Sequence, residues 1–316
     1  MIEKPTLFIL GAGASKPYGF PTARELRALI VKSFYDDYKK LYISMGKNDL
    51  SDVVFSDIRI FVESFERSSI YSVDKYLGLH PSEQESGKLA ITFYIRQNEI
   101  NMKFRENIGP DYYKEDWYSL LFNRMIEDIK ESNGSDKFKE NKIAFITFNY
   151  DNSLEYFLAQ SFSNAFSENR YLNTDIPFPI VHVYGQLPRW GPTWGSSLNY
   201  RETPISVESN IRMSRGIHVI GERLGDELKE GIKKLIAWSK RIFFCGFGYA
   251  KDNLEAINFP INLDGSLSIY GSAKGKTDTE IQRARFSLIE NPSSPYFLLN
   301  PRIEKMNTFD LLREFL

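Results

Sequence analysis

The sequence predicts an α/β fold built on an open, parallel β-sheet. The support for this fold is a set of short, unbroken apolar runs that end in glycine or small polar residues, with helical patterns between several of them. Unbroken apolar runs are typical of strands that are buried on both faces, as in parallel sheets. Sheets whose strands alternate with helices bind ligands at the carboxyl ends of the strands. We therefore expect the functional site in the turns that follow the strands.

Five apolar runs give the expected strands in chain order. The first is TLFIL at 6–10, the second is IAFIT at 143–147, and the fourth is RIFFC at 241–245. The third covers 179–184 and the last covers 266–270. The turns after the first, second and fourth runs read GAGAS, FNYD and GFG. Glycine and polar residues thus mark the predicted ligand edge of the sheet.

Helical patterns fill most of the space between these strands. Periodicity begins at Arg24 and continues with Leu26, Ile30 and Phe34 on one face. From about 31 to 140 the pattern is mostly helical with poor strand signals, so we expect a helical insertion over one edge of the sheet.

The remaining segments complete the expected organisation. The polar stretch 131–141 is expected to be a surface loop. We predict a single domain over 1–316, with its core in 1–30 and 141–316. Two further helices are marked by apolar side chains at helical spacing: Leu121, Met125 and Ile129 in the first, and Leu224, Leu228, Ile232 and Leu235 in the second.

Composition excludes several classes of protein. The net charge of -1 provides no general attraction for nucleic acid or for an anionic membrane. A single cysteine, Cys245, excludes an internal disulfide and a four-cysteine zinc site, and three histidines argue against a histidine-rich metal centre. We expect no metal, no membrane span and, because the N-terminus lacks the basic run of a secretory signal, a cytoplasmic location.

The turn after the first strand has the composition of a phosphate-binding loop. Glycine lets the backbone turn tightly and bring its N–H groups against a phosphate. Gly11 and Gly13 fit this use, but Lys16 stands where the third glycine of the G-x-G-x-x-G fingerprint would be. Taken alone, the motif is equally compatible with a glycine turn that binds nothing.

Four blocks together resemble the sirtuin (Sir2-like) family. The first block resembles the family's GAGxS…GxPxxR, and Thr147 to Asp151 (TFNYD) is similar to its T-x-N-x-D. VHVYG at 181–185 stands in the place of the His-Gly pair, and FCGFGYAKD at 244–252 is similar to GxGxxxD. The matching positions of the first block are Gly11, Ala12, Gly13, Ser15, Gly19, Pro21 and Arg24.

This resemblance implies a Rossmann-like, sirtuin/DHS-like core with NAD as substrate. It implies that Asn149 orients the ribose or the attacking water and that Asp151 receives the nicotinamide carboxamide. A neutral amide also suits this chemistry in itself, because it can bind a hydroxyl or water without adding positive charge beside an oxocarbenium-like sugar. The alternative for Asn149 is a helix cap or an Asx-turn. The implied NAD-binding residues are Gly11, Ala12, Gly13, Ser15, Pro21, Arg24, Tyr184, Gly185, Gly246 and Gly248.

The expected catalytic base is His182. In sirtuins the histidine directly precedes the glycine, whereas here Tyr184 precedes Gly185 and His182 lies two residues earlier. On a strand, residues two apart point to the same side, so His182 is expected to reach the pocket. The alternative is a structural histidine, with Tyr184 as the group that faces the pocket.

The absence of a four-cysteine module disfavours protein deacylation. Water is then the simplest acceptor, which gives an NAD+ glycohydrolase that releases nicotinamide and ADP-ribose; the sequence leaves cyclisation of the product open. The resemblance is closest to zinc-free bacterial proteins, which implies an NAD-depleting effector of anti-phage defence controlled by a separate sensor protein or by its own oligomer. One alternative is a non-catalytic NAD or ADP-ribose sensor or regulatory subunit. Another is a nucleic-acid-associated subunit, against which the near-zero net charge weighs.

Overall fold

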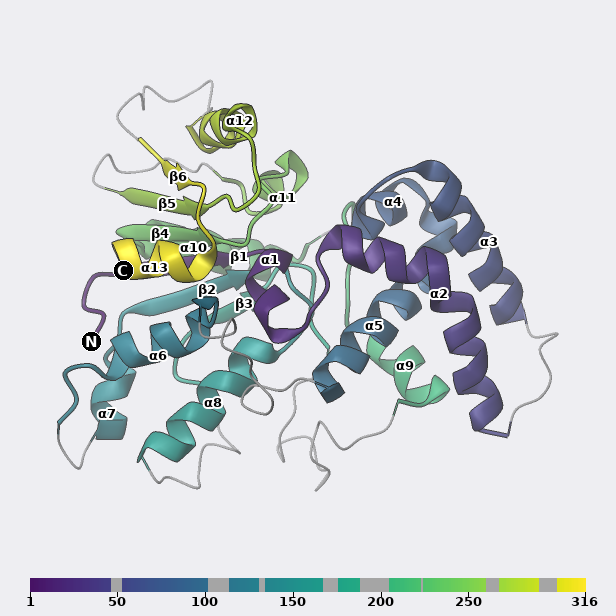
Figure 1. The fold of residues 1–316 in the computed structure, drawn as a ribbon, viewed down its shortest axis with the longest axis horizontal. Helices are drawn as coiled ribbons and strands as arrows, with labels where there is room; N and C mark the ends of the chain where they lie inside the picture. The colour runs from purple at the N-terminus through teal and green to yellow at the C-terminus, as the bar shows by residue number, and fades with distance from the viewer. Residues whose placement is uncertain are drawn as a thin grey trace.

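A computed structural model gives the fold shown in Figure 1 and confirms the predicted α/β architecture. Six strands form one parallel sheet in the order β3-β2-β1-β4-β5-β6, which is the order of Rossmann-type sheets. The structure describes residues 1–46, 53–101, 114–130, 134–166, 176–187, 205–222, 224–259, 267–289 and 300–316.

Three strands coincide with the apolar runs that predict them, and three differ. The third strand is shorter than expected and ends at His182, and the fifth extends to Ser272. The sixth has three residues, too few to show a periodicity or an apolar run. The strands are β1 (Thr6–Leu10), β2 (Ile143–Thr147), β3 (Ile180–His182), β4 (Arg241–Cys245), β5 (Ser268–Ser272) and β6 (Arg302–Glu304).

A row of aromatic rings crosses the sheet and fixes its register. Phe8 of β1 pairs with Phe145 of β2 and with Phe243 of β4, and the ring centroids lie 5.2 and 5.6 Å apart. Phe243 in turn stacks on Tyr270 of β5 at 5.0 Å. Such pairs add about 0.5–1.5 kcal/mol each beyond the area that they bury. A slip of one residue would turn every ring to the opposite face, so the row holds the strand ends level at the ligand edge.

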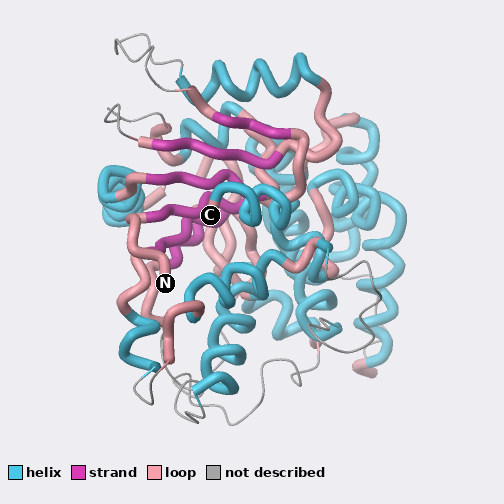
Figure 2. The backbone as a smooth tube through the Cα atoms, turned by 60° about the vertical axis from the view of Figure 1, so that its left-hand side comes forward, coloured by secondary structure: helices cyan, strands magenta, loops and turns pink. Residues whose placement is uncertain are grey.

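Helices cover both faces of the sheet, as Figure 2 shows. The short helices α1 (Ala12–Ser15) and η1 (Lys16–Tyr18) follow β1 directly. The others are α2 (Ala23–Ser44), α3 (Val53–Ser68), α4 (Val73–Leu79), η2 (Pro81–Glu83), α5 (Gln84–Asn101), α6 (Trp117–Ile126), α7 (Gly134–Lys139), α8 (Ser153–Phe166), α9 (Val207–Ser214), α10 (Asp226–Trp238), α11 (Lys251–Ala256), α12 (Asp278–Ile289) and α13 (Thr308–Phe315).

Helices α2, α3, α4, α5 and α9 gather beside the sheet, and we call them the helical lobe (Figure 1). Its interior is aromatic: Phe34, Tyr38, Phe61, Phe65 and Tyr76 are all fully buried. The high aromatic content of the chain therefore serves packing in this region. Because α9 follows β3 in the chain, the lobe includes a segment outside the predicted insertion at 31–140.

The expected loop at 131–141 contains helix α7, whose apolar residue Phe138 is buried among other rings. One buried aromatic residue in a polar segment gives no helical periodicity, which is why the pattern predicts a loop. Within the part of the chain that the structure describes, no helix has the length and apolar character needed to cross a bilayer.

Candidate functional site

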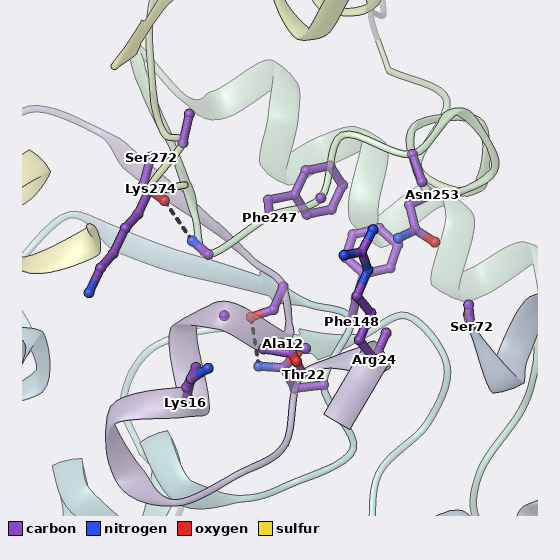
Figure 3. A pocket seen from close by; sticks show the side chains of 18 of the residues that line it. Ala12, Lys16, Thr22, Arg24, Ser72, Phe148, Phe247, Asn253, Ser272 and Lys274 are labelled. Atoms are coloured by element: carbon purple, nitrogen blue, oxygen red, sulfur yellow. Dashed lines mark hydrogen bonds between the residues drawn. The ribbon is translucent and has the colours of Figure 1, made fainter. Parts of the chain in front are cut away.

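A cavity of about 780 Å³ opens at the carboxyl ends of the strands. Turns after all six strands line it, and it is centred where the strand order reverses between β1 and β4. Its volume lies within the range of about 300–1,000 Å³ that is usual for small-molecule and cofactor sites. Figure 3 shows Lys16 and Lys274 at one end of the cavity and Ser72 and Asn253 at the other.

The glycine turns after β1 and β4 pack directly against each other. A Cβ atom on Gly11 would lie 2.7 Å from the carbonyl oxygen of Gly246, and one on Gly13 would lie 2.9 Å from the Cα atom of Gly246. Gly246 itself has a φ of +55°, and its backbone oxygen accepts a hydrogen bond from the Gly13 N–H at 3.0 Å. These three glycines are therefore required for turn-to-turn packing, a cause that local sequence does not show.

Gly248 has different surroundings from these three. No heavy atom lies within 4 Å of a Cβ built on it, and the residue lines the cavity. Of the four predicted glycines in the two turns, Gly248 is thus the one whose missing side chain leaves space for a ligand.

Asn149 lines the cavity, with its amide group held in one orientation. Its Nδ2 atom donates to the carbonyl oxygen of Gly11 at 3.1 Å and to Ser15 Oγ at 2.9 Å. A carbonyl oxygen can only accept, so the Gly11 contact places the NH₂ group there. Among the described residues no donor reaches Asn149 Oδ1, which leaves this oxygen for a ligand. The side chain does not cap helix α8.

Asp151 lies behind Asn149 and does not line the cavity. Its carboxyl group accepts hydrogen bonds from Ser15 Oγ at 3.3 Å and from the N–H and hydroxyl groups of Ser153. Burial raises the pKa of Asp151, and these hydrogen bonds offset only part of that effect. In this geometry Asp151 positions Ser15, which in turn holds Asn149, rather than facing a carboxamide in the cavity.

His182 is also buried outside the cavity lining, contrary to the expectation that it faces the pocket. The strand rule fails here because β3 ends at His182 and the chain turns at Val183 and Tyr184. The Nδ1 atom of His182 lies 2.8 Å from the carbonyl oxygen of Asn149, and Nε2 lies 2.7 Å from Glu155 Oε1.

These two contacts leave His182 without a free lone pair. The Asn149 carbonyl requires a proton on Nδ1, and the contact with Glu155 places a second proton between Nε2 and the carboxyl group. Burial in itself lowers the pKa of His182, but the Glu155 carboxylate and the Asn149 carbonyl together raise it above its ordinary value. In this arrangement His182 does not serve as a base. We refer to Ser15, Asp151, Ser153, Glu155 and His182 as the polar layer.

Tyr184 occupies the position that was expected for the histidine. It lines the cavity, and its hydroxyl donates to Asn253 Oδ1 at 3.2 Å. Burial raises the pKa of Tyr184, so it stays protonated at neutral pH. Gly185 has a φ of +72°, and a Cβ on it would lie 2.2 Å from the carbonyl oxygen of Gly216, so its role here is to pack the turn.

Arg24 lines the cavity from the first turn of α2. This helix begins at Ala23 because Thr22 and Glu25 form a capping box, with the Thr22 N–H donating to Glu25 at 2.8 Å. The Arg24 guanidinium lies 4.4 Å from the centre of the Tyr71 ring. Of the other residues in the first block, Ala12 lines the cavity, whereas Ser15 and Pro21 do not.

Charged residues line the cavity as well, and among them Asp74, Lys75 and Lys276 lie outside the sequence motifs. Lys75 pairs with Asp252 at 2.8 Å, Lys16 pairs with Glu25 at 2.7 Å, and Lys274 contacts Glu115. Among the described residues, neither Arg24 nor Lys276 lies within ion-pair distance of a carboxylate, although both interact electrostatically with Glu280, which also lines the cavity. Asp74 and Lys75 come from the helical lobe, which brings a separate part of the chain to the site.

No family model and no curated protein matches this chain. The resemblance to Sir2-like proteins therefore rests on the four blocks of residues alone. Within the described ranges, no group of three or more His, Cys, Asp or Glu side chains is placed to hold a metal ion.

Proposed function

We propose that the protein hydrolyses NAD+ at the bond between nicotinamide and ribose. The observation that carries this proposal is the position of Asn149 against the turn after β1, beside the point between β1 and β4 where the strand order reverses. Its NH₂ group is fixed by Gly11 and Ser15, and its oxygen is left for a ligand. In sheets of this order, dinucleotides bind across that point.

Cleavage of the bond between nicotinamide and ribose does not require a general acid. When the C–N bond breaks, nicotinamide leaves as a neutral molecule, so no proton has to be delivered to it. The sugar that remains is an oxocarbenium-like cation, which water attacks readily if it is well placed. NAD+ and water then give nicotinamide, ADP-ribose and one proton. A fixed amide oxygen that binds a ribose hydroxyl or the water fits this requirement.

Two cations that form no ion pair among the described residues fit the other half of the ligand. Arg24 and Lys276 both line the cavity and can neutralise a pyrophosphate. Gly248 leaves open space in the lining of the same cavity. A ligand with two phosphates and two sugars would engage the turns after β1, β2, β4 and β5 together.

The test is release of nicotinamide from NAD+ by the purified protein. We expect Asn149→Ala to reduce turnover by about 100-fold or more, since catalysis by positioning and by fixed dipoles is of this size. The control is Asn123→Ala, the same change at an exposed position on α6. Turnover that survives in Asn149→Ala would contradict the proposal, and chromatography of the products separates hydrolysis from cyclisation.

A second function, binding of NAD or ADP-ribose without cleavage, is favoured by one observation. Both ring nitrogens of His182 are engaged inside the protein, so the base that the family resemblance implies is not in the cavity. A sensor would bind NAD+ with the same residues and release no nicotinamide under any condition.

A role as an NAD-depleting effector of anti-phage defence rests on the family resemblance. It requires control by a separate sensor protein or by the protein's own oligomer. Comparing nicotinamide release by the protein alone, at increasing concentration, and together with the product of a neighbouring gene tests both forms of control.

A further inference from the structure

Asp74 brings a carboxyl group from the helical lobe to the cavity. It is the second residue of α4, directly after the N-cap Ser72 and Val73, and it lines the cavity together with Ser72 and Lys75. Ser72 lies at the end of the cavity opposite Lys16 and Lys274 (Figure 3). No motif in the sequence marks Asp74.

The two contacts of the Tyr150 hydroxyl group indicate whether the Asp74 carboxyl group carries a proton. Tyr150 Oη contacts Asp74 Oδ1 and also lies 2.8 Å from the carbonyl oxygen of His218. A phenol carries one hydrogen, and a backbone carbonyl can only accept. Both contacts are hydrogen bonds at once only if Tyr150 donates to His218 and Asp74 donates to the phenol oxygen. An ionised Asp74 would leave one pair of oxygen atoms in contact with no hydrogen between them.

The surrounding charges favour the same protonation state. The cation nearest in sequence, Lys75, is paired with Asp252 at 2.8 Å, so it is not available to Asp74. Loss of hydration raises the pKa of Asp74, and this effect outweighs the stabilisation that the Tyr150 phenol, the Asp74 backbone N–H and Ser72 would together give to an ionised carboxylate. The titratable and charged groups around Asp74 and Tyr150 are Tyr184, Lys75, Asp252, Glu222, His218 and, paired with Glu222, Lys88.

We propose that Asp74 is a neutral carboxylic acid in the folded protein at neutral pH and determines ligand specificity at this end of the cavity. One oxygen carries the proton that Tyr150 receives, and the other is an uncharged acceptor. Such an acceptor takes a hydrogen bond from a hydroxyl or an amide N–H of the ligand without repelling the ligand's phosphates. The ligand class rests on the proposed function, whereas the protonation state does not.

The protonation state is tested without any ligand. Carbon-13 spectra of the full chain with labelled aspartate identify the Asp74 carboxyl as the signal that Asp74→Asn removes. We expect this signal to remain that of a protonated acid at pH 7. A signal that is ionised at pH 7 overturns the proposal, whatever NAD+ does.

Unfolding measurements give an independent reading. When folding raises the pKa of a carboxyl group, that group lowers the free energy of unfolding of the protein as pH rises from the ordinary aspartate pKa towards the pKa in the folded state. Asp74→Asn keeps the neutral shape and removes that loss, so we expect it to become more stable relative to wild type as pH rises. The exposed control Asp57→Asn should follow wild type at every pH. Parallel curves for Asp74→Asn and wild type overturn the proposal.

NAD+ affinity, measured by calorimetry between pH 6 and 9, tests the ligand class. The NAD+ affinity of wild type should fall as pH rises and Asp74 ionises. The NAD+ affinity of Asp74→Asn should lie within about threefold of wild type at pH 6 and should not fall as pH rises. Asp74→Ala should bind about tenfold more weakly, the loss expected for one hydrogen bond. Wild type and Asp74→Asn with the same pH dependence contradict the assigned specificity. No NAD+ binding by any variant overturns the proposed function and the ligand class, while the carboxyl signal still decides the protonation state.

Discussion

The helical lobe and the polar layer behind Asn149 are both buried, but they are built from opposite chemistry. The lobe is filled by stacked and tilted aromatic rings, such as Phe61 on Phe65. The polar layer holds two carboxyl groups, two hydroxyls and an imidazole, each less than one-tenth exposed. Beside that layer, burial raises the pKa of Glu99 to about 8.

Burying ionisable groups costs free energy, whereas burying rings stabilises the fold. A layer of this kind is therefore expected where side chains must be held in one geometry, and it lies directly behind the Asn149 amide that lines the cavity. The comparison separates residues that provide stability from residues that provide position.

The largest effect on stability is expected in the lobe. Phe34 is fully buried against Tyr38, Phe93 and Tyr94, so Phe34→Ala should lower the free energy of unfolding by about 3–5 kcal/mol. Urea denaturation measures this change. If the lobe serves packing alone, NAD+ affinity under conditions where the variant is folded should stay within about twofold of wild type. A loss below about 1 kcal/mol would show that the lobe is not packed as described.

Breaking the pair of His182 and Glu155 should cost about 3 kcal/mol or more. His182→Phe leaves a buried carboxylate without its partner, and such losses are about 3–5 kcal/mol. The double variant His182→Phe, Glu155→Gln should recover part of the loss, because a neutral amide is less costly to bury. A double variant no more stable than the single one would contradict an ion pair at this position.

The same pair predicts a pH dependence with a definite sign. The folded pKa of His182 is raised, so its contribution to stability is complete below the ordinary pKa of about 6.5 and is lost as pH rises through the folded value. The difference in free energy of unfolding between wild type and the double variant should therefore decrease above about pH 6.5. Denaturation at pH 6, 7, 8 and 9 measures this, and a gap that widens over the range would refute it.

Ser15→Ala should have a smaller effect on stability and a specific effect on turnover. It removes the hydroxyl that accepts from Asn149 and donates to Asp151, at a cost of about 1–3 kcal/mol. Nicotinamide release should fall about tenfold through kcat with KM little changed, because Asn149 loses its fixed orientation. Ser287→Ala, in α12, is the matched control. An equal fall in nicotinamide release in Ser15→Ala and Ser287→Ala would show that the effect does not depend on the contact between Ser15 and Asn149.

The smallest effect on folding is expected for Gly248→Ala. A methyl group there meets no atom within 4 Å, so the free energy of unfolding should change by less than about 0.5 kcal/mol. NAD+ affinity should nevertheless fall, because the methyl group occupies space that we assign to the ligand. Gly231→Ala, which also meets no atom within 4 Å, is the control in α10. Unchanged affinity in Gly248→Ala would place the ligand elsewhere in the cavity.

Much of the fold is predictable because its strands are buried on both faces. The runs at 6–10, 143–147 and 241–245 have no polar face to interrupt them, and they form β1, β2 and β4. The three-residue strand β6 and the helix α7 have too little pattern to detect. Helix α9 joins the lobe through tertiary contacts that no local signal encodes.

Only those site residues that directly follow a strand can be predicted from the sequence. Asn149 and the glycine turns lie at the cavity because parallel strands place their carboxyl ends on one edge. The expectation for His182 depended on extending the strand rule past the last residue of β3, where the chain turns. Asp74 lies in another segment altogether, and only the packing of the helical lobe beside the sheet brings it to the cavity.

The hydrogen bonds that Asn149 Nδ2 donates to Gly11 and Ser15 have one more consequence. Aspartate has the same outline as asparagine, yet at position 149 it would set a charged oxygen against the lone pairs of the Gly11 carbonyl. Slow hydrolytic loss of ammonia from this one residue would therefore remove the fixed amide on which the proposed function depends. A one-dalton increase in the mass of the peptide that contains position 149 would then distinguish intact from aged molecules in a preparation that otherwise looks uniform.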